Sequence, residues 1–212
     1  MERIKEWVLR LLAVFFQVKI VSNKKERKIF NKEWHEIWLQ EGYAKENEPI
    51  IQKYSKYNRF SIDLLVRFLE IVPAGTMRII RNNKEFGLPT LNDFEVKKIW
   101  RTEKIAEITL LTVPKKFRQK KFLGPLFVSL SFMVLMKALY QITRKQEFEG
   151  LLIAADKRLF YSLTKRIKLP FVKIGEAKYY EGSLTIPAYM TMDDFEQVFF
   201  KNNPQLAKFV FW

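Results

Sequence analysis

At Ala106–Arg118 the sequence reads AEITLLTVPKKFR. Its first eight residues are mostly apolar or β-branched, and Pro114 follows them directly. Such residues favour strands, and a proline cannot continue a ladder of backbone hydrogen bonds. We therefore predict a central strand over 106–113, with Glu107 as the one acidic residue inside it.

The segments on either side of this strand predict an α/β fold. Pro125–Thr143 has leucines and valines at helical spacing, and Gly150–Ala155 is a short apolar strand. A strand–helix–strand unit of this kind places its two strands parallel. Upstream, Ser61–Leu69 and Val72–Ile80 predict two strands joined as a hairpin. Strands interleaved with helices indicate one α/β sheet.

The remaining segments are assigned by the same patterns. We expect helices over Met1–Val21, Lys28–Gln40, Lys157–Ile167 and Met192–Val198, loops over Glu41–Ile51 and Arg81–Asp93, and strands over Phe171–Ile174 and Glu181–Met190.

Composition excludes several kinds of site. The 212 residues include no Cys, so thiolate nucleophiles, disulfides and Cys-based zinc sites are impossible. The one histidine, His35, lies between Trp34 and Glu36 in a helical pattern, and we interpret it as a partly buried surface residue. We therefore expect neither a metal site nor a catalytic triad.

The net charge is +15, from 38 Lys and Arg against 23 Asp and Glu. Nucleic acid, an anionic membrane, or an acidic protein or phosphate-bearing substrate could each explain it. The basic residues are spread along the chain without an RNA-recognition, KH or helix-turn-helix signature, so nucleic acid is the rival interpretation and not the favoured one. Residues 1–21 are too charged for a signal peptide or a spanning helix. We expect a cytoplasmic protein whose N-terminal helix docks on the domain, with contact to a membrane surface as the alternative.

A basic run follows the predicted central strand. Five of the seven residues in Lys115–Lys121 are Lys or Arg, and a long helix begins shortly afterwards. A helix N-terminus offers free N–H groups and partial positive charge, so it suits phosphate or pyrophosphate. Ligands of α/β folds also bind beyond the ends of central strands. We favour an anion site here over a merely solvated charge run.

Three motifs occur in a recognisable order: GTMRII at Gly75–Ile80, the Ala106–Arg118 stretch, and IGEAKYYEGSLTIPAYM at Ile174–Met190. Together they resemble GNAT-fold N-acyltransferases, in particular N-acyl amino acid synthases and the related acyl-homoserine lactone synthases. NNPQL at Asn202–Leu206 is similar to the tail of the first group. The resemblance extends from about Ile37 to the C-terminus. It implies one GNAT-like domain over 1–212, with N-terminal helices in 1–50, a mixed, mostly antiparallel sheet over 60–190, and a helix and tail over 191–212.

The resemblance also implies an activity. Such enzymes take an acyl chain from acyl carrier protein or acyl-CoA as co-substrate, and they bind no further cofactor. Arg78, Glu107 and Arg118 match arginine and glutamate positions of the family motifs. We expect Glu107 to remove a proton from an amine that attacks the thioester, and Arg78 to hold a carboxylate of the acceptor. The alternatives are that Glu107 points outward or forms a structural ion pair with Arg78.

The donor should bind along the central strand and the basic run. Strand N–H groups near Leu111 and Val113 would polarise the thioester carbonyl, and the basic side chains would meet the pantetheine phosphate or an acidic carrier protein. The expected donor-binding residues are Leu111, Thr112, Val113, Lys115, Lys116, Arg118, Lys120, Lys121 and Gly124, and the expected acyl-pocket residues are Leu126, Leu130 and Phe132.

Two departures bear on the acceptor. Thr109–Leu110 stands where the family has Ser-Arg, and Ser55–Asn58 stands where it has an Asp-x-Tyr-Asp stretch. In the lactone synthases those acids are linked to recognition of the amine substrate. We therefore expect an N-acyltransferase acting on an amino acid or similar small amine, with a lactone-type synthase as the alternative.

Overall fold

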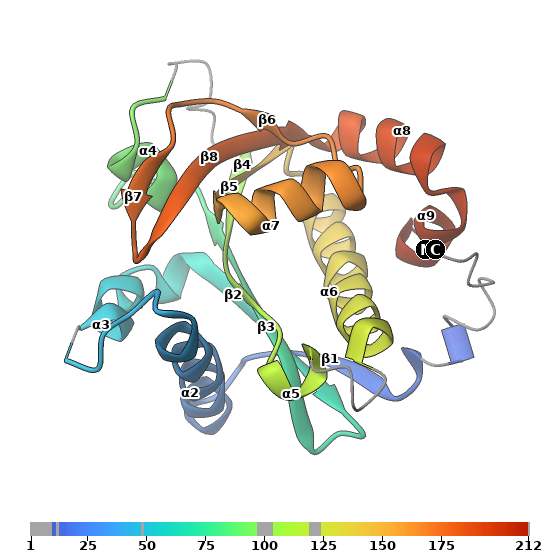
Figure 1. The fold of residues 1–212 in the computed structure, drawn as a ribbon, viewed down its shortest axis with the longest axis horizontal. Helices are drawn as coiled ribbons and strands as arrows, with labels where there is room; N and C mark the ends of the chain where they lie inside the picture. The colour runs from blue at the N-terminus through green and yellow to red at the C-terminus, as the bar shows by residue number, and fades with distance from the viewer. Residues whose placement is uncertain (1–9, 12, 48, 97–103, 119–123, 212) are drawn as a thin grey trace.

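The computed structural model describes residues 10–11, 13–47, 49–96, 104–118 and 124–211, and only the backbone of Lys116, Arg118 and residues 124–129. One sheet runs through the molecule with helices against both faces (Figure 1). Its strand order is β1-β2-β3-β4-β5-β8-β6, with β7 paired to β8. Only β4 and β5 pair in parallel; the other pairings are antiparallel. The predicted mixed, mostly antiparallel sheet is confirmed.

The strands are β1 (Phe16–Ile20), β2 (Ser61–Phe68), β3 (Val72–Arg81), β4 (Ile105–Thr112), β5 (Gly150–Asp156), β6 (Val172–Lys173), β7 (Lys178–Tyr180) and β8 (Ser183–Thr191). The helices are α2 (Lys24–Glu41), α3 (Ile50–Ser55), α4 (Pro89–Asp93), α5 (Lys115–Arg118), α6 (Gly124–Lys145), α7 (Lys157–Tyr161), α8 (Met192–Asn202) and α9 (Pro204–Phe211), with a 3-10 turn at Asn58–Phe60 and a π turn at Ser162–Arg166.

The predicted hairpin and the parallel pair β4–β5 are confirmed. The prediction of helix throughout Met1–Val21 is wrong for Phe16–Ile20, which form β1 on the edge of the sheet. Phe16 is buried and its ring lies 5.2 Å from that of Phe68, so pairing with β2 overrides the local helical spacing. Four other members of that helical pattern, Ile4, Trp7, Val8 and Leu12, lie outside the described residues.

Four shorter segments also differ from prediction. α4 begins at Pro89 inside the expected loop, because a proline suits the first turn of a helix. α3 begins at Ile50, within the other expected loop. Glu181 and Gly182 form a two-residue hairpin turn between β7 and β8, both with positive φ (46° and 74°), and not the start of a strand. The expected C-terminal tail contains α9.

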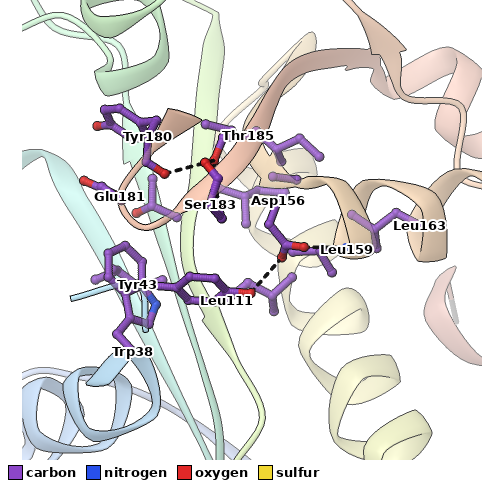
Figure 2. Close-up of a pocket in the computed structure, with 16 residues that line it drawn as sticks. Trp38, Tyr43, Leu111, Asp156, Leu159, Leu163, Tyr180, Glu181, Ser183 and Thr185 are labelled. Atoms are coloured by element: carbon purple, nitrogen blue, oxygen red, sulfur yellow. Dashed lines mark hydrogen bonds between the residues drawn. The ribbon is translucent and has the colours of Figure 1, made fainter. Parts of the chain in front are cut away.

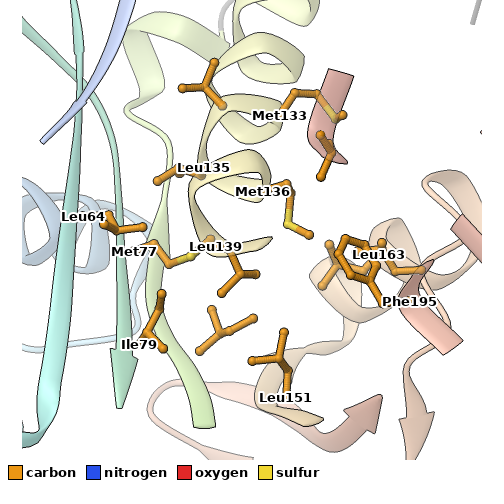
Figure 3. Packing of buried hydrophobic residues seen from close by; sticks show 14 of the residues in the cluster. Leu64, Met77, Ile79, Met133, Leu135, Met136, Leu139, Leu151, Leu163 and Phe195 are labelled. Carbon is orange, nitrogen blue, oxygen red and sulfur yellow. The ribbon is translucent and has the colours of Figure 1, made fainter. Parts of the chain in front are cut away.

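The two faces of the sheet carry separate apolar clusters. α6, α8 and α9 cover one face, where buried side chains of β1, β2, β3, β4, β5 and β8 form one apolar cluster with those of α6 (Figures 1 and 3). α2 and α3 lie against the other face. α2 begins at an Asn23 cap, ends at Gly42 in the left-handed region, and buries Phe30, Trp34 and Ile37 against the sheet. The site described below is lined by residues of both clusters.

β4 and β5 pair over only half their length. Ile105–Ile108 pair with Gly150–Ile153, and no pairing joins the later residues of the two strands. β4 also carries a bulge: it has one more residue than β3 between two ladder positions, and Leu110 has a φ of 49°. The sheet therefore opens between the two strands.

Candidate active site

A cavity of about 120 Å³ lies where β4 and β5 separate. Its walls come from both strands, from Trp38 and Tyr43 at the end of α2, and from the β7–β8 hairpin (Figure 2). A smaller cavity of about 60 Å³ adjoins it and reaches Glu107. We call these the outer and inner lobes of one cleft. They share the lining residues Trp38, Thr109, Leu110, Ala154, Tyr180 and Glu181.

Glu107 lines the inner lobe and is only 1% exposed. The Thr90 N–H and the Thr90 hydroxyl each donate a hydrogen bond of 2.9 Å to its carboxylate, from the first turn of α4. Burial raises the pKa of Glu107 to about 8, although the bonds from Thr90 act in the opposite direction. No described residue forms an ion pair with it, so this carboxyl group can exchange a proton near neutral pH.

The two alternatives for Glu107 are wrong. Its side chain is buried, so it does not point outward. It forms no ion pair with Arg78, whose nearest acidic partner is Asp63. Both residues do lie on the same face of the sheet, because Glu107 pairs with Ile80 in the antiparallel register, two residues from Arg78.

Arg78 is 1% exposed and makes four hydrogen bonds within the protein. Two join its guanidinium to the Asp63 carboxylate, at 2.6 and 2.8 Å. The others run to the Tyr54 carbonyl oxygen (2.8 Å) and the Asn58 side chain (2.9 Å). Arg27 also donates to Asp63 and Asn58. The bidentate carboxylate partner predicted for Arg78 is thus internal, and Arg78 lines neither lobe.

The predicted donor-binding residues divide into several groups. Leu111 lines the outer lobe. Thr112 is buried and its hydroxyl is 2.6 Å from that of Thr76, whereas Val113 is half-buried and Lys115 is exposed. Backbone alone is described for Lys116, Arg118 and Gly124, and Lys120 and Lys121 lie outside the described residues.

Two of the three residues predicted to form the acyl pocket have described side chains, and both belong to the apolar core. Leu130 is buried in the cluster beneath α6, and Phe132 packs against the same cluster. Neither residue lines a lobe. For Leu126 only the backbone is described. The apolar face of α6 serves the core, as its neighbours in Figure 3 show.

A polar cluster that the sequence did not reveal closes the other side of the inner lobe. Lys53 donates to the Tyr180 hydroxyl and to Glu181, both at 2.7 Å. The Tyr54 hydroxyl donates to both Glu181 oxygens, at 3.0 and 3.2 Å, and the Tyr180 hydroxyl donates to Asp93. The quoted YYEG stretch contains Tyr180 and Glu181, but its partners are more than 80 residues away in sequence.

The outer lobe has a polar contact of its own. The Tyr43 hydroxyl donates to Asp156 at 3.1 Å (Figure 2), and Asp156 also caps α7 by accepting from the N–H groups of Arg158 and Leu159. Burial raises the pKa of Tyr43 to about 12, so its hydroxyl remains a donor at neutral pH. This contact closes the outer lobe at the end of β5.

No family model and no curated protein sequence matches the chain. Solved structures do. FeeM, an N-acyl amino acid synthase from uncultured soil microbes, superposes with a TM-score of 0.67 at 16% identity, over 86% of this chain and 93% of FeeM. The CoA-dependent acyl-homoserine lactone synthase BjaI gives 0.64 at 14% identity, over 88% and 89%. The lactone synthase LasI gives 0.62 at 16% identity, over 83% and 89%.

The chain shares the fold of these three enzymes. This confirms the fold expected from the three motifs. At identities of 14–16% the likeness concerns the fold, so the site must be argued from its own residues. Among the described residues, no group of three His, Asp or Glu side chains could hold a metal ion, and no helix is long and apolar enough to cross a membrane.

Proposed function

We propose that this protein is an N-acyltransferase that moves an acyl chain from acyl carrier protein or acyl-CoA to the amine of an amino acid or similar small acceptor. One observation carries the proposal: a buried glutamate whose pKa is raised to about 8 lines a cleft between two diverging strands. An acid with a pKa near the working pH is suited to act as a general base. FeeM is itself an N-acyl amino acid synthase, and BjaI has been solved with isopentyl-CoA.

The reaction is aminolysis of a thioester. The neutral amine attacks the carbonyl carbon, so a nitrogen–carbon bond forms and the carbon–sulfur bond breaks. Glu107 takes a proton from the nitrogen, and the leaving thiolate takes one to become the thiol. The β4 bulge at Leu110 interrupts backbone pairing beside the outer lobe. We assign N–H groups near Leu111 and Val113 to the thioester carbonyl, whose oxygen gains negative charge during attack.

The donor arm would enter between β4 and β5, where the two strands no longer pair. Leu111 on one strand and Ala154 on the other line the opening. α5, which follows β4, begins with the exposed Lys115. The predicted basic group, Lys115, Lys116, Arg118, Lys120 and Lys121, would meet the donor phosphate or an acidic carrier protein.

A lactone-type synthase is the less favoured alternative. Asn58, which stands where the family has an acid, accepts hydrogen bonds from Arg27 and Arg78 in the buried cluster around Asp63. It lines neither lobe. The position is therefore part of the scaffold here, which leaves recognition of the acceptor to other residues.

Contact with a membrane surface stays a prediction for residues 1–21. Leu11, Val14 and Phe15 are exposed, and so are Leu69 and Ile71 in the β2–β3 turn. Leu69 donates its N–H to the Phe15 carbonyl oxygen, so these two groups of apolar side chains are neighbours. The contact would be supported if the unaltered protein binds vesicles rich in anionic lipid and the Ile71→Ser variant binds them less. Equal binding by the unaltered protein and the variant would exclude this patch as the contact.

Mass spectrometry tests the enzyme proposal directly. Purified protein is incubated with acyl-carrier and acyl-CoA donors and a panel of amines, and N-acyl products are measured. We expect a product from at least one donor and a loss of about 10²–10⁴-fold in rate for Glu107→Gln. The matched control is Glu176→Gln, whose parent side chain is 95% exposed. No product from any donor, or full activity in Glu107→Gln, would overturn the proposal.

A further inference from the structure

We infer that the acceptor is a slender primary amine with no carboxylate on its amine-bearing carbon, and that Glu181 holds it as an ammonium ion. This inference rests on the proposed function and narrows its substrate class. It depends on the wall of the inner lobe, where the rings of Trp38, Tyr54, Phe94 and Tyr180 surround the carboxylates of Glu107 and Glu181. Aromatic faces and carboxylates both attract a cation.

A substrate carboxylate would find no cationic partner among the described residues that line this lobe, because none of them is a lysine or an arginine. Of the lysines bonded to this wall, Lys53 already donates to Glu181 and Tyr180, and Lys178 donates to the Asp93 carbonyl oxygen. Arg78 is occupied by Asp63 on the far side of Tyr54. An α-carboxylate would therefore be buried beside two other carboxyl groups without a cation of its own, which is unfavourable.

The volume of the inner lobe also favours an acceptor without an α-carboxylate. The inner lobe, at about 60 Å³, has half the volume of the outer lobe and holds only a few waters. That space accepts an ammonium group and the methylene that carries it. A carboxylate on the same carbon adds three heavy atoms. The outer lobe, at about 120 Å³, is the part assigned to the donor thioester, so the amine and the thioester carbonyl meet where the two lobes join.

Glu181 has the capacity and the position to bind the ammonium. Its Oε1 accepts from Lys53 and Tyr54, but its Oε2 accepts only from Tyr54 among the hydrogen bonds of the described residues. A carboxylate oxygen can accept two bonds. The Thr109 hydroxyl, on the opposite wall of the same lobe, is buried and has no hydrogen-bond partner. These two groups leave unused acceptor sites facing one small space.

The hairpin turn fixes Glu181 in place. Gly182, the next residue, has a φ of 74°, and a Cβ there would lie 2.1 Å from the Gly42 carbonyl oxygen. Only glycine allows this approach of the turn to the end of α2. Glu181 is thus held by the turn on one side and by Tyr54 of α3 on the other. Such a fixed carboxylate is suited to orient an incoming cation.

The acceptor nitrogen loses two protons during the reaction. The acceptor enters as an ammonium ion beside Glu181, and ionised Glu107 removes one proton, which passes to solvent. The neutral amine then attacks the thioester carbonyl carbon. Glu107 takes the second proton from the new nitrogen–carbon adduct and delivers it to the thiolate sulfur as the carbon–sulfur bond breaks. The products are an amide, a thiol and one proton.

Matched acceptors test the inference with one donor and the unaltered protein. Tyramine is compared with tyrosine, and 3-methylbutylamine with leucine, by initial rates of N-acyl product. We expect kcat/KM at least about tenfold higher for each amine than for its amino acid. If the amino acids are acylated equally well or better, the inference fails and the acyltransferase proposal stands. If no acceptor of either kind is acylated, both fail.

Two variants test the role of Glu181. Glu181→Gln keeps the size of the side chain and a bond from Tyr54, and we expect KM for tyramine to rise at least about tenfold while kcat changes less than about threefold. Lys53→Met removes the competing cation and should lower that KM. Glu176→Gln is the control, and thermal melting checks that each variant folds. An unchanged KM in Glu181→Gln, or a change in melting alone, overturns the assignment.

Discussion

Arg78 on β3 and Glu107 on β4 are neighbours on one face of the sheet, and each is 1% exposed, yet their surroundings are opposite. Arg78 makes four hydrogen bonds to groups of the protein and lies away from both lobes. Glu107 accepts two bonds from one threonine, has no ion-pair partner among the described residues, and lines the inner lobe. The guanidinium of Arg78 thus has a full set of partners, whereas the carboxyl group of Glu107 faces the cleft without a countercharge.

The difference shows how one fold separates stability from chemistry. A buried charge with a full set of partners has no reason to change its protonation, so it acts as a fixed link between β2, β3 and α3. A buried acid without a countercharge favours its neutral form, so once ionised it readily takes up a proton again. Two neighbouring strand positions therefore suit different tasks, the first a structural one and the second the proposed proton transfer.

The largest change in stability should come from replacing Arg78, the buried charge with a full set of hydrogen-bond partners. Arg78→Met leaves buried Asp63 with Arg27 as its ion-pair partner, and we expect a loss of about 3–5 kcal/mol in the free energy of unfolding. Urea unfolding measures it, with Arg81→Met, at an exposed position of the same strand, as the control within about 0.5 kcal/mol. A loss below about 1 kcal/mol would show that the cluster is not a structural link.

Glu107 should affect stability in a pH-dependent way. Its pKa is raised in the folded protein, from an ordinary value near 4.5 to about 8. The folded state therefore favours the protonated form, and this contribution is complete below pH 4.5 and is lost as the pH rises to 8. Relative to Glu107→Gln, the wild type should lose on the order of 3–5 kcal/mol across that window and then level off. A stability difference independent of pH would contradict the raised pKa.

Activity should rise with pH over the same range in which the contribution of Glu107 to stability is lost. Ionised Glu107 is the proposed base, so kcat/KM should rise with pH, tenfold per unit at most, and level off above a pKa of about 8. The remaining activity of Glu107→Gln should lack that step. A profile that falls over pH 6–8 in the wild type, or an unchanged step in the variant, would assign the titration to another group.

The strand positions of Glu107 and Arg78 could be predicted from the sequence, but the partners of their side chains could not. A glutamate inside an apolar strand is visible by inspection, and so is the hairpin that places Asp63 opposite Arg78. The motif alone nevertheless suggests a substrate partner for Arg78, because it carries no information on which residue pairs with Arg78 across the hairpin. Glu181 was missed because Tyr54, its partner, is 127 residues away. Separations of that size are determined by tertiary packing and not by local pattern.

The smaller errors in the predicted secondary structure have a related cause. β1 and α4 are each five residues long, so their own sequences hold little periodicity. β1 is a strand because it pairs with β2, and α4 starts where Pro89 suits a first helical turn. The long elements, such as α6 and the β2–β3 hairpin, were predicted because their apolar patterns extend over many residues.

The smallest effect is expected from an exposed charge. Lys115 begins α5 beyond the end of β4 and is solvent-exposed, so it should assist the approach of an anionic donor without taking part in the reaction. We expect Lys115→Glu to raise KM for acyl carrier protein about two- to fivefold at low salt, with kcat and the unfolding free energy almost unchanged. The increase should shrink above about 0.3 M salt, because exposed charges are screened. Lys157→Glu, at an exposed position at the start of α7, is the matched control. An equal rise in KM for both variants would indicate a response to net charge, whereas a rise for Lys115→Glu alone would locate the approach of the donor beside the opening between β4 and β5.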